Sequence, residues 1–336
     1  MEILVIHTGG TVSCQNEGGV LVPKKDIAPV FKEISKELFK KSDVRFVHRH
    51  IKPFLSENLN GAILTKIANE VRAGIQSCRY HGVIVTHGSD TIAYTSALLA
   101  YIFGNDCIPT VTVCADLPLD DPRSSGHINL RAAAVLAASE ERGVFSVYRD
   151  SDTSAVIHRG SRILRHRTYE NELSSVSYPY GKVLLIAPEN PKIVKDPRFS
   201  ESEDGIIFEP EALKKTSDIM LFNCYPGAVF PTPTRTCKAV ILGSYHSGTL
   251  CTDSAELKKF ARLCKKRDIP VFVDGVGLGS DYESMEAYSY LGITRLPPLS
   301  SPAAMYIKLW LLISNGEREL AEMLYRPCGS DLPPTR

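Results

Sequence analysis

The sequence lacks the features that would place it in a membrane or on a nucleic acid. No apolar run reaches the roughly 18 residues that a membrane-spanning helix needs. The formal net charge is only +1 over 336 residues, so no excess of one sign favours nucleic acid or an acidic membrane surface. The first residues carry no basic segment and no signal-peptide core. We therefore expect a cytoplasmic protein with no nucleic-acid partner and no membrane partner.

Motifs for metal and nucleotide binding are also absent. None of the nine cysteines forms a CxxC pair or stands near a histidine at metal-ligand spacing. The chain has no GxGxxG fingerprint and no GK[ST] phosphate loop. These absences predict no metal site, no cofactor, and cysteines that remain reduced thiols, most of them in the core.

What the sequence does contain is an alternation of short apolar runs with longer amphipathic stretches. Residues 2–6, 82–88 and 110–115 are predicted strands, whereas 59–75 and 90–103 have the spacing of helices. Nearly continuous apolar strands that alternate with helices indicate a mostly parallel sheet covered on both faces. We therefore predict an α/β fold, with a larger N-terminal doubly wound parallel-sheet domain and a smaller C-terminal α/β domain.

A change in composition sets the predicted domain boundaries. The middle of the chain, roughly 165–215, is polar and rich in proline, and a second strand–helix alternation follows it. The N-terminal domain is predicted over 1–185, a linker over 186–215 and the C-terminal domain over 216–328. The remaining tail has too little apolar content to be ordered on its own.

A glycine-rich turn, HTGGTVS, follows the first predicted strand. Thr11 comes directly after two glycines, which let the backbone turn sharply and approach a ligand closely. A hydroxyl there would point into a crevice, beside backbone N–H groups able to hold an oxyanion. A threonine hydroxyl needs a helper to become a nucleophile. Taken alone, the motif is more typical of an ordinary turn between a strand and a helix.

A second turn, HGSDT, follows the strand predicted at 82–88. It offers the Ser89 hydroxyl and the Asp90 carboxylate. Both residue types are favoured N-caps, so capping of the following helix is the simpler interpretation of this turn. Two hydroxyl-bearing glycine turns at strand ends of one sheet nevertheless favour a shared site, because parallel sheets bind ligands at the carboxyl ends of their strands.

Two further segments are charged. The run HRGSRILRHR, residues 158–167, contains four arginines and two histidines; it fits either an anion site or a solvated polar segment. The loop ADLPLDDPRSSG, residues 115–126, is interpreted as a turn that could also line the crevice.

The two turns together resemble the signatures of the bacterial-type L-asparaginases, in particular their cytoplasmic type I group, and the resemblance runs through almost the whole chain. HTGGTVS is similar to the first signature, whose second threonine is the nucleophile, which implies Thr11 in that role. HGSDT is similar to the second signature, HGTDT, which implies catalytic roles for Ser89 and Asp90. The glycines of the two turns, Gly10 and Gly88, would then contact the substrate through their backbone.

The resemblance also implies the rest of the substrate site and the reaction. The segment LSENL is similar to a substrate-binding segment, in which Ser56 would hold the substrate carboxylate with Glu57 beside it. A carbonyl near Ala115 would face the leaving amide. The implied reaction is hydrolysis of a small-molecule side-chain carboxamide through an acyl-enzyme, with release of ammonia. The family implies a homodimer or homotetramer in which a neighbour's small domain closes part of the pocket.

Two departures from the family pattern affect the helpers of the nucleophile. Arg165 stands where the family has a lysine that shares protons with the second hydroxyl, and arginine is effectively always protonated. Arg165 could therefore only orient Ser89 and favour a nearby negative charge. Leu21 stands where the family has a tyrosine in the loop that closes over the nucleophile.

These departures leave two functional hypotheses. One is an active amidohydrolase with altered activation, acting on asparagine or glutamine, free or within a larger molecule. The asparaginase-like component of archaeal glutamyl-tRNA amidotransferase, which hydrolyses free glutamine for a partner, gives the family a precedent for a different substrate context. The other is a catalytically impaired member that binds an amino acid or an anionic ligand.

Overall fold

The N-terminal part of the chain is built on one eight-stranded sheet. The computed structural model describes residues 1–23, 26–40, 42–168, 170–187, 190–206, 208, 213 and 216–334. The strand order is β10-β9-β8-β7-β6-β5-β1-β4. The five strands from β7 to β4 run parallel, and β8, β9 and β10 are added antiparallel. Their bounds are β1 Glu2–Gly9, β4 Arg45–Phe54, β5 Gly82–Thr86, β6 Thr110–Val113, β7 Val144–Ser151, β8 Ser154–Arg159, β9 Gly181–Leu184 and β10 Lys192–Lys195.

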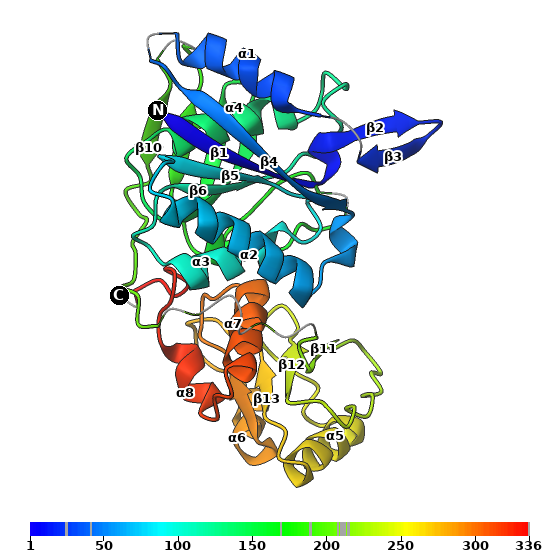
Figure 1. Ribbon diagram of the computed structural model, residues 1–336. Helices are drawn as coiled ribbons and strands as arrows, with labels where there is room; N and C mark the ends of the chain where they lie inside the picture. Colours follow the sequence, from blue (N-terminus) through cyan, green and yellow to red (C-terminus); the bar gives the residue numbers. More distant parts are fainter. Residues whose placement is uncertain are drawn as a thin grey trace.

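Helices cover both faces of this sheet (Figure 1). On one face lie α1 (Ala28–Leu38) and α4 (Gly126–Ala137), and on the other lie α2 (Gly61–Gln76) and α3 (Ile92–Phe103). The strands are continuous apolar runs because successive side chains enter two different cores: Ile3 and Val5 pack with α1 and α4, while Leu4 packs with α2 and α3.

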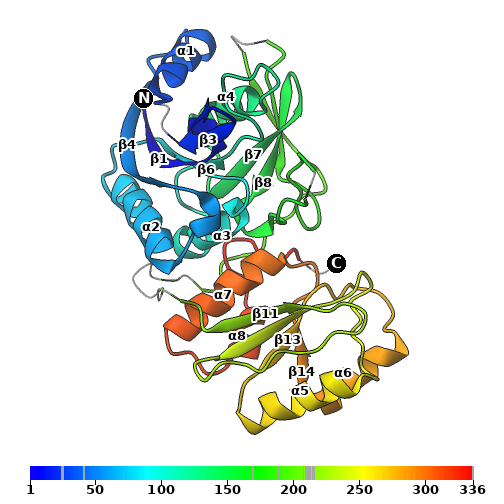
Figure 2. The same cartoon turned by 90° about the vertical axis from the view of Figure 1, so that its right-hand side faces the viewer.

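The C-terminal part is a smaller four-stranded parallel sheet in the order β11-β12-β13-β14. Its bounds are β11 Ile219–Asn223, β12 Ala239–Gly243, β13 Val271–Val273 and β14 Ile293–Arg295, with helices α5 Ala255–Lys266, α6 Ala287–Leu291, α7 Pro302–Ser314 and α8 Leu320–Tyr325. Helix α7 lies between this sheet and α3, as Figure 2 shows. Most residues of α7 are buried because one side of the helix packs on the N-terminal domain and the other packs on the C-terminal sheet.

The segment after the last helix returns to the N-terminal domain. Ser330 and Asp331 are fully buried there, and the hydroxyl of Ser161 donates to the carbonyl of Gly329 at 2.6 Å. Arg162, which is 1% exposed, donates through Nε to the Ser330 carbonyl at 2.6 Å. The tail is ordered by these polar contacts with the other domain, which an apolar count along the sequence does not detect.

The predicted α/β fold class, with a large, mostly parallel sheet and a smaller parallel sheet, is confirmed by this architecture. The linker boundary stays a prediction: part of 186–215 lies outside the described residues, and β10, within that range, pairs with β9. Among the residues that the structure describes, no helix is long and apolar enough to cross a bilayer. Several elements were not predicted, among them α1, β9, β10 and β14. The hairpin of β2 (Cys14–Glu17) and β3 (Val20–Pro23), which projects from the sheet, is another (Figure 1).

Candidate active site

The predicted site residues follow four neighbouring parallel strands. Because β4, β1, β5 and β6 are consecutive in the sheet and parallel, their carboxyl ends lie side by side. Gly10 and Thr11 follow β1, Ser56 and Glu57 follow β4, Gly88, Ser89 and Asp90 follow β5, and Ala115 follows β6. The structure thus gathers every predicted site residue except Arg165 at the ends of adjacent strands.

The two glycine turns are in direct contact. Gly10 has φ +80°, a backbone conformation that favours glycine. A Cβ built on Gly10 would overlap the carbonyl oxygen of His87 and lie 2.7 Å from the backbone nitrogen of Gly88. A larger residue at Gly10 would therefore separate the turns. The glycine places Thr11, which begins the 3-10 turn η1 (Thr11–Ser13), beside the backbone that leads to Ser89.

Asp90 is held by a side chain from a third strand end. The Ser56 hydroxyl donates to Asp90 Oδ2 at 2.8 Å, and the Thr91 hydroxyl donates to the Ser56 carbonyl at 2.9 Å. The alternative interpretation, in which Ser89 or Asp90 caps the following helix, is wrong. Helix α3 begins at Ile92 with Thr91 as its N-cap and no side-chain capping bond, because the Asp90 carboxylate is bonded to Ser56 instead.

The imidazole of His87 connects the second turn to helix α3. It is fully buried; its Nδ1 lies 2.9 Å from the carbonyl oxygen of Gly88, and its Nε2 lies 2.8 Å from the Thr95 hydroxyl. The buried imidazole fixes the backbone of the turn to helix α3, so the position of Ser89 depends on a neutral His87.

Acid is therefore expected to destabilise the protein. Burial lowers the pKa of His87 to about 4, and burial likewise lowers the pKa of His7 to about 4 and of His158 to about 3. The unfolded chain binds these protons near pH 6.5, so stability is complete above 6.5 and falls as the pH drops toward 4. Urea unfolding at pH 5 should show a loss of about 2 kcal/mol per buried histidine relative to pH 7.5.

Single substitutions check this assignment. His87→Gln should reduce the pH dependence of the free energy of unfolding, whereas His246→Gln, at an exposed position, should leave it unchanged. Equal free energies of unfolding at the two pH values would contradict the prediction.

Arg165 lies apart from the strand-end cluster. It follows the 3-10 turn η3 (Gly160–Arg162), is exposed, and contacts the hydroxyl of Tyr94 on α3. Burial raises the pKa of the Tyr94 hydroxyl, and the charge and hydrogen bond of Arg165 partly offset this effect. Within the described part of the chain, no hydrogen bond joins Arg165 to Ser89.

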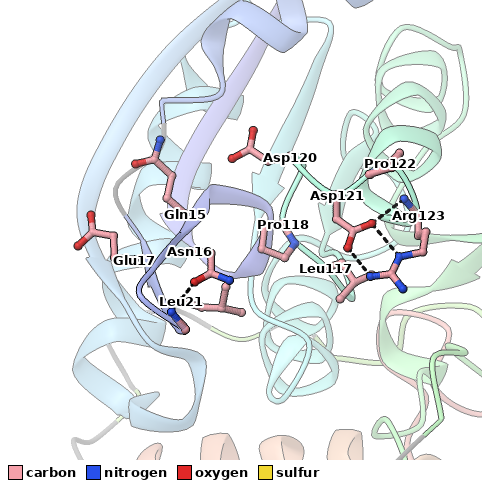
Figure 3. Close-up of a pocket in the computed structure, with 11 residues that line it drawn as sticks. Gln15, Asn16, Glu17, Leu21, Leu117, Pro118, Asp120, Asp121, Pro122 and Arg123 are labelled. Carbon is pink, nitrogen blue, oxygen red and sulfur yellow. Dashed lines mark hydrogen bonds and ion pairs between the residues drawn. The ribbon is translucent and has the colours of Figure 1, made fainter.

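The β2–β3 hairpin, which follows the turn of Thr11, bounds an open hollow. Figure 3 shows this hollow, whose volume is about 1000 Å³, between the β2–β3 hairpin and the loop 117–123. Leu21 is 43% exposed on the hairpin side, and Asp120 and Asp121 lie on the loop side. Asp121 is paired with Arg123 at 2.6 Å. The residues that line this hollow belong to the hairpin and the loop, and the predicted site residues at the strand ends are not among them.

Sequence reasoning did not single out two residues, Asp116 and His166, that lie around Tyr148 of β7. Asp116 follows Ala115 and accepts hydrogen bonds from the backbone N–H and the hydroxyl of Ser125 at 2.8 and 2.7 Å. His166, the neighbour of Arg165, packs its ring edge-on against Tyr148 at 5.4 Å. Both residues stood in segments that the sequence marked as charged, but no local pattern separates them from the surrounding charges.

The sequence matches the model of a known protein family. The model described as "Asparaginase, N-terminal" matches residues 2–196, which contain the strand-end cluster. The chain belongs to the asparaginase family. This finding confirms the resemblance stated from the two signatures.

Curated relatives and solved structures agree with this assignment. The chain is 25% identical to a component of the glutamyl-tRNA(Gln) amidotransferase of Saccharolobus solfataricus, over 96% of this chain and 74% of that protein. It is 28% identical to the L-asparaginase of Thermococcus kodakarensis, over 50% of this chain and 49% of that protein, so the matched stretch spans about half of this relative. The structure of the thermostable L-asparaginase from Thermococcus kodakarensis superposes with a TM-score of 0.78 at 21% identity, over 100% of both chains. At that identity the superposition shows the asparaginase fold alone.

Proposed function

We propose that this asparaginase-family protein hydrolyses a side-chain carboxamide, of asparagine or glutamine, free or within a larger molecule, with Thr11 as the nucleophile. The contact between the turns of Gly10 and Gly88 carries the proposal, because it sets Thr11 beside the backbone that leads to Ser89. Without that contact, nothing would bring the hydroxyls of Thr11 and Ser89 into one site.

The reaction follows from the groups at the strand ends. The Thr11 oxygen attacks the carboxamide carbon, and backbone N–H groups of the two glycine turns stabilise the oxyanion that forms. Ammonia leaves near the carbonyl of Ala115, and water then hydrolyses the ester on Thr11. Ser56, Glu57 and Asp90 hold the charged groups of the substrate, in an arrangement that the bond between Ser56 and Asp90 supports.

The β2–β3 hairpin follows Thr11 directly in the chain, and the open hollow that it borders has room for the remainder of a substrate larger than free asparagine. Its volume of about 1000 Å³ is at the upper end of what small-molecule sites enclose. The test is ammonia release from asparagine, from glutamine and from short peptides that carry either side chain, by the wild type and by Thr11→Ala. If no ammonia is released from any of these amides, the protein is the catalytically impaired member that binds an amino acid or an anion.

Arg165→Lys should raise ammonia release. A lysine amine can exchange a proton with Ser89 once substrate binding brings the two together, which a guanidinium cannot do. The measurement is kcat/KM on the best amide of the panel, and Arg167→Lys, an exposed position two residues away, is the matched control. An unchanged rate in Arg165→Lys would remove Arg165 from the proposed site.

We also propose that the protein works as a homodimer or homotetramer on a small-molecule amide. One of its relatives is part of an amidotransferase assembly, which supports the idea that members of this family act in complexes. Analytical ultracentrifugation of the purified protein tests this proposal, and a monomer at the concentrations of the assay would contradict it.

A further inference from the structure

A pocket of about 380 Å³ lies where the two domains meet, and we call it the interdomain pocket. One wall comes from the segments that begin α2 and α3. The other comes from β11 and from α7, which Figure 1 shows packed below those two helices. Among its lining residues are Leu64, Tyr94, Ser217, Leu221, Tyr306 and Trp310. Sites for small molecules commonly have this size and commonly lie at domain interfaces.

The interdomain pocket is lined by aromatic rings and carries no charge of its own. The rings of Tyr94 and Tyr306 meet edge to face at 5.8 Å, and those of Tyr306 and Trp310 meet at 5.9 Å. Burial raises the pKa of the Tyr306 hydroxyl, so this group is neutral at physiological pH. None of the described residues that line the pocket is charged. An ion would lose its hydration there without an opposite charge in return, so the lining favours an uncharged molecule.

One hydrogen-bond donor in this wall has no acceptor. Trp310 is only 6% exposed, and its Nε1 is buried without a hydrogen-bond partner in the described part of the chain. The N–H group of a buried tryptophan usually finds a partner, because an unpaired buried donor costs free energy. A ligand that offers an acceptor to Nε1 would remove that cost.

Ser217 supplies a second donor. Its hydroxyl oxygen accepts hydrogen bonds from the Tyr306 hydroxyl at 2.8 Å and from the backbone N–H of Ile219 at 3.3 Å. These two bonds use the lone pairs of the oxygen, so the hydroxyl hydrogen is left to donate. The polar groups of the pocket therefore suit a ligand with a hydrogen-bond acceptor, such as a carbonyl oxygen or a ring nitrogen.

The pocket adjoins the segment that carries Ser56. Thr91 also lines the pocket, and its hydroxyl donates to the Ser56 carbonyl at 2.9 Å. Asn60, another lining residue, is the N-cap of α2 and accepts from the backbone N–H groups of Ala62 and Ile63. A molecule in the pocket would thus touch Thr91 on one side and the C-terminal domain on the other.

We propose that the interdomain pocket binds an uncharged aromatic molecule of one or two rings that presents a hydrogen-bond acceptor to Trp310. The ring packs among the side chains of Tyr94, Tyr306 and Leu221, and its carbonyl oxygen or ring nitrogen accepts from Nε1. This site is separate from the strand-end cluster around Thr11, and the inference does not depend on the proposed hydrolysis.

The chain contains a single tryptophan, so Trp310 reports on the pocket directly. Protein labelled with ¹⁵N-tryptophan should give one indole N–H signal in a proton–nitrogen NMR spectrum. Acetophenone, an uncharged ring with a carbonyl acceptor, should move the indole proton to lower field in a saturable way, with a Kd on the order of 1 mM or tighter for nine heavy atoms. Benzoate has the same size but carries a negative charge, and should leave the signal in place at the same concentrations.

Variants check the assigned contact. Trp310→Phe keeps an aromatic ring and removes the N–H group, so it should weaken acetophenone binding about 10-fold, measured from the broadening of the acetophenone signals. Tyr290→Phe, an exposed position outside the pocket, is the matched control and should bind like the wild type.

Three results would overturn the inference. One is an indole signal that does not move, or moves without saturation, up to 10-fold above the expected Kd of about 1 mM. Another is an equal response to benzoate. The third is full affinity in a folded Trp310→Phe variant. If the unresponsive protein sediments as a dimer, the pocket belongs to a contact between two copies of the chain and not to a small molecule.

Discussion

Thr11→Val should reduce ammonia release by about 10⁴-fold or more, because removal of a nucleophile leaves only the oxyanion-stabilising and binding contributions of a site. Valine keeps the branched shape of threonine and removes only the hydroxyl, so the half-buried turn keeps its packing. The measurement is kcat/KM for ammonia release on the best amide of the panel, at a pH above 7.

Two further variants sharpen this result. Thr11→Ser keeps a hydroxyl and should keep a measurable rate, whereas Ser13→Ala removes a second hydroxyl from the same 3-10 turn and should leave the rate close to the wild type. A rate in Thr11→Val that equals that of Ser13→Ala would exclude Thr11 as the nucleophile.

Asp331→Asn should destabilise the protein by about 3–5 kcal/mol. Lys308 Nζ lies 2.8 Å from Asp331 Oδ2, and both side chains are 0% exposed. The Tyr101 hydroxyl also donates to Oδ2 at 3.2 Å, and the backbone N–H of Cys328 donates to Oδ1 at 2.9 Å. Asparagine preserves the shape of the side chain but leaves the Lys308 ammonium buried without an opposite charge.

Urea unfolding at pH 7 measures this effect. Glu322→Gln is the matched control, because it breaks the exposed pair with Arg326, and such pairs contribute less than about 1 kcal/mol. Lys308→Met combined with Asp331→Asn should recover part of the loss, because the unpaired charge is gone. An Asp331→Asn variant no less stable than Glu322→Gln would show that the buried pair does not hold the tail.

The sequence predicts the parts of this molecule that depend on local patterns. Apolar runs identify the strands because strands of a parallel sheet are buried on both faces. The two glycine turns predict a site because ligands bind at strand ends. The family signatures then assign Thr11 and Ser89 roles that the turns alone do not.

The remaining features depend on contacts between distant segments. The hydrogen bond from the Ser56 hydroxyl to Asp90, which removes Asp90 from helix capping, joins residues 34 apart in the chain. The ring of His166 meets Tyr148 of β7, and no spacing rule links these two residues. The β2–β3 hairpin has one polar strand, CQNE, and a short second strand, so it lacks the apolar run by which strands were predicted.

The buried tail also has a consequence for the order in which the protein is made. Arg162 lies in the N-terminal domain, and its guanidinium finds acceptors at Ser200 and at Ser330. Residues 328–331 leave the ribosome after the C-terminal domain. Ser161 and Arg162 therefore lack their partners Gly329 and Ser330 until synthesis is almost finished. The first domain to be synthesised is therefore completed last, and a ribosome-stalled chain that ends before residue 328 should expose Ser161 and Arg162 to solvent.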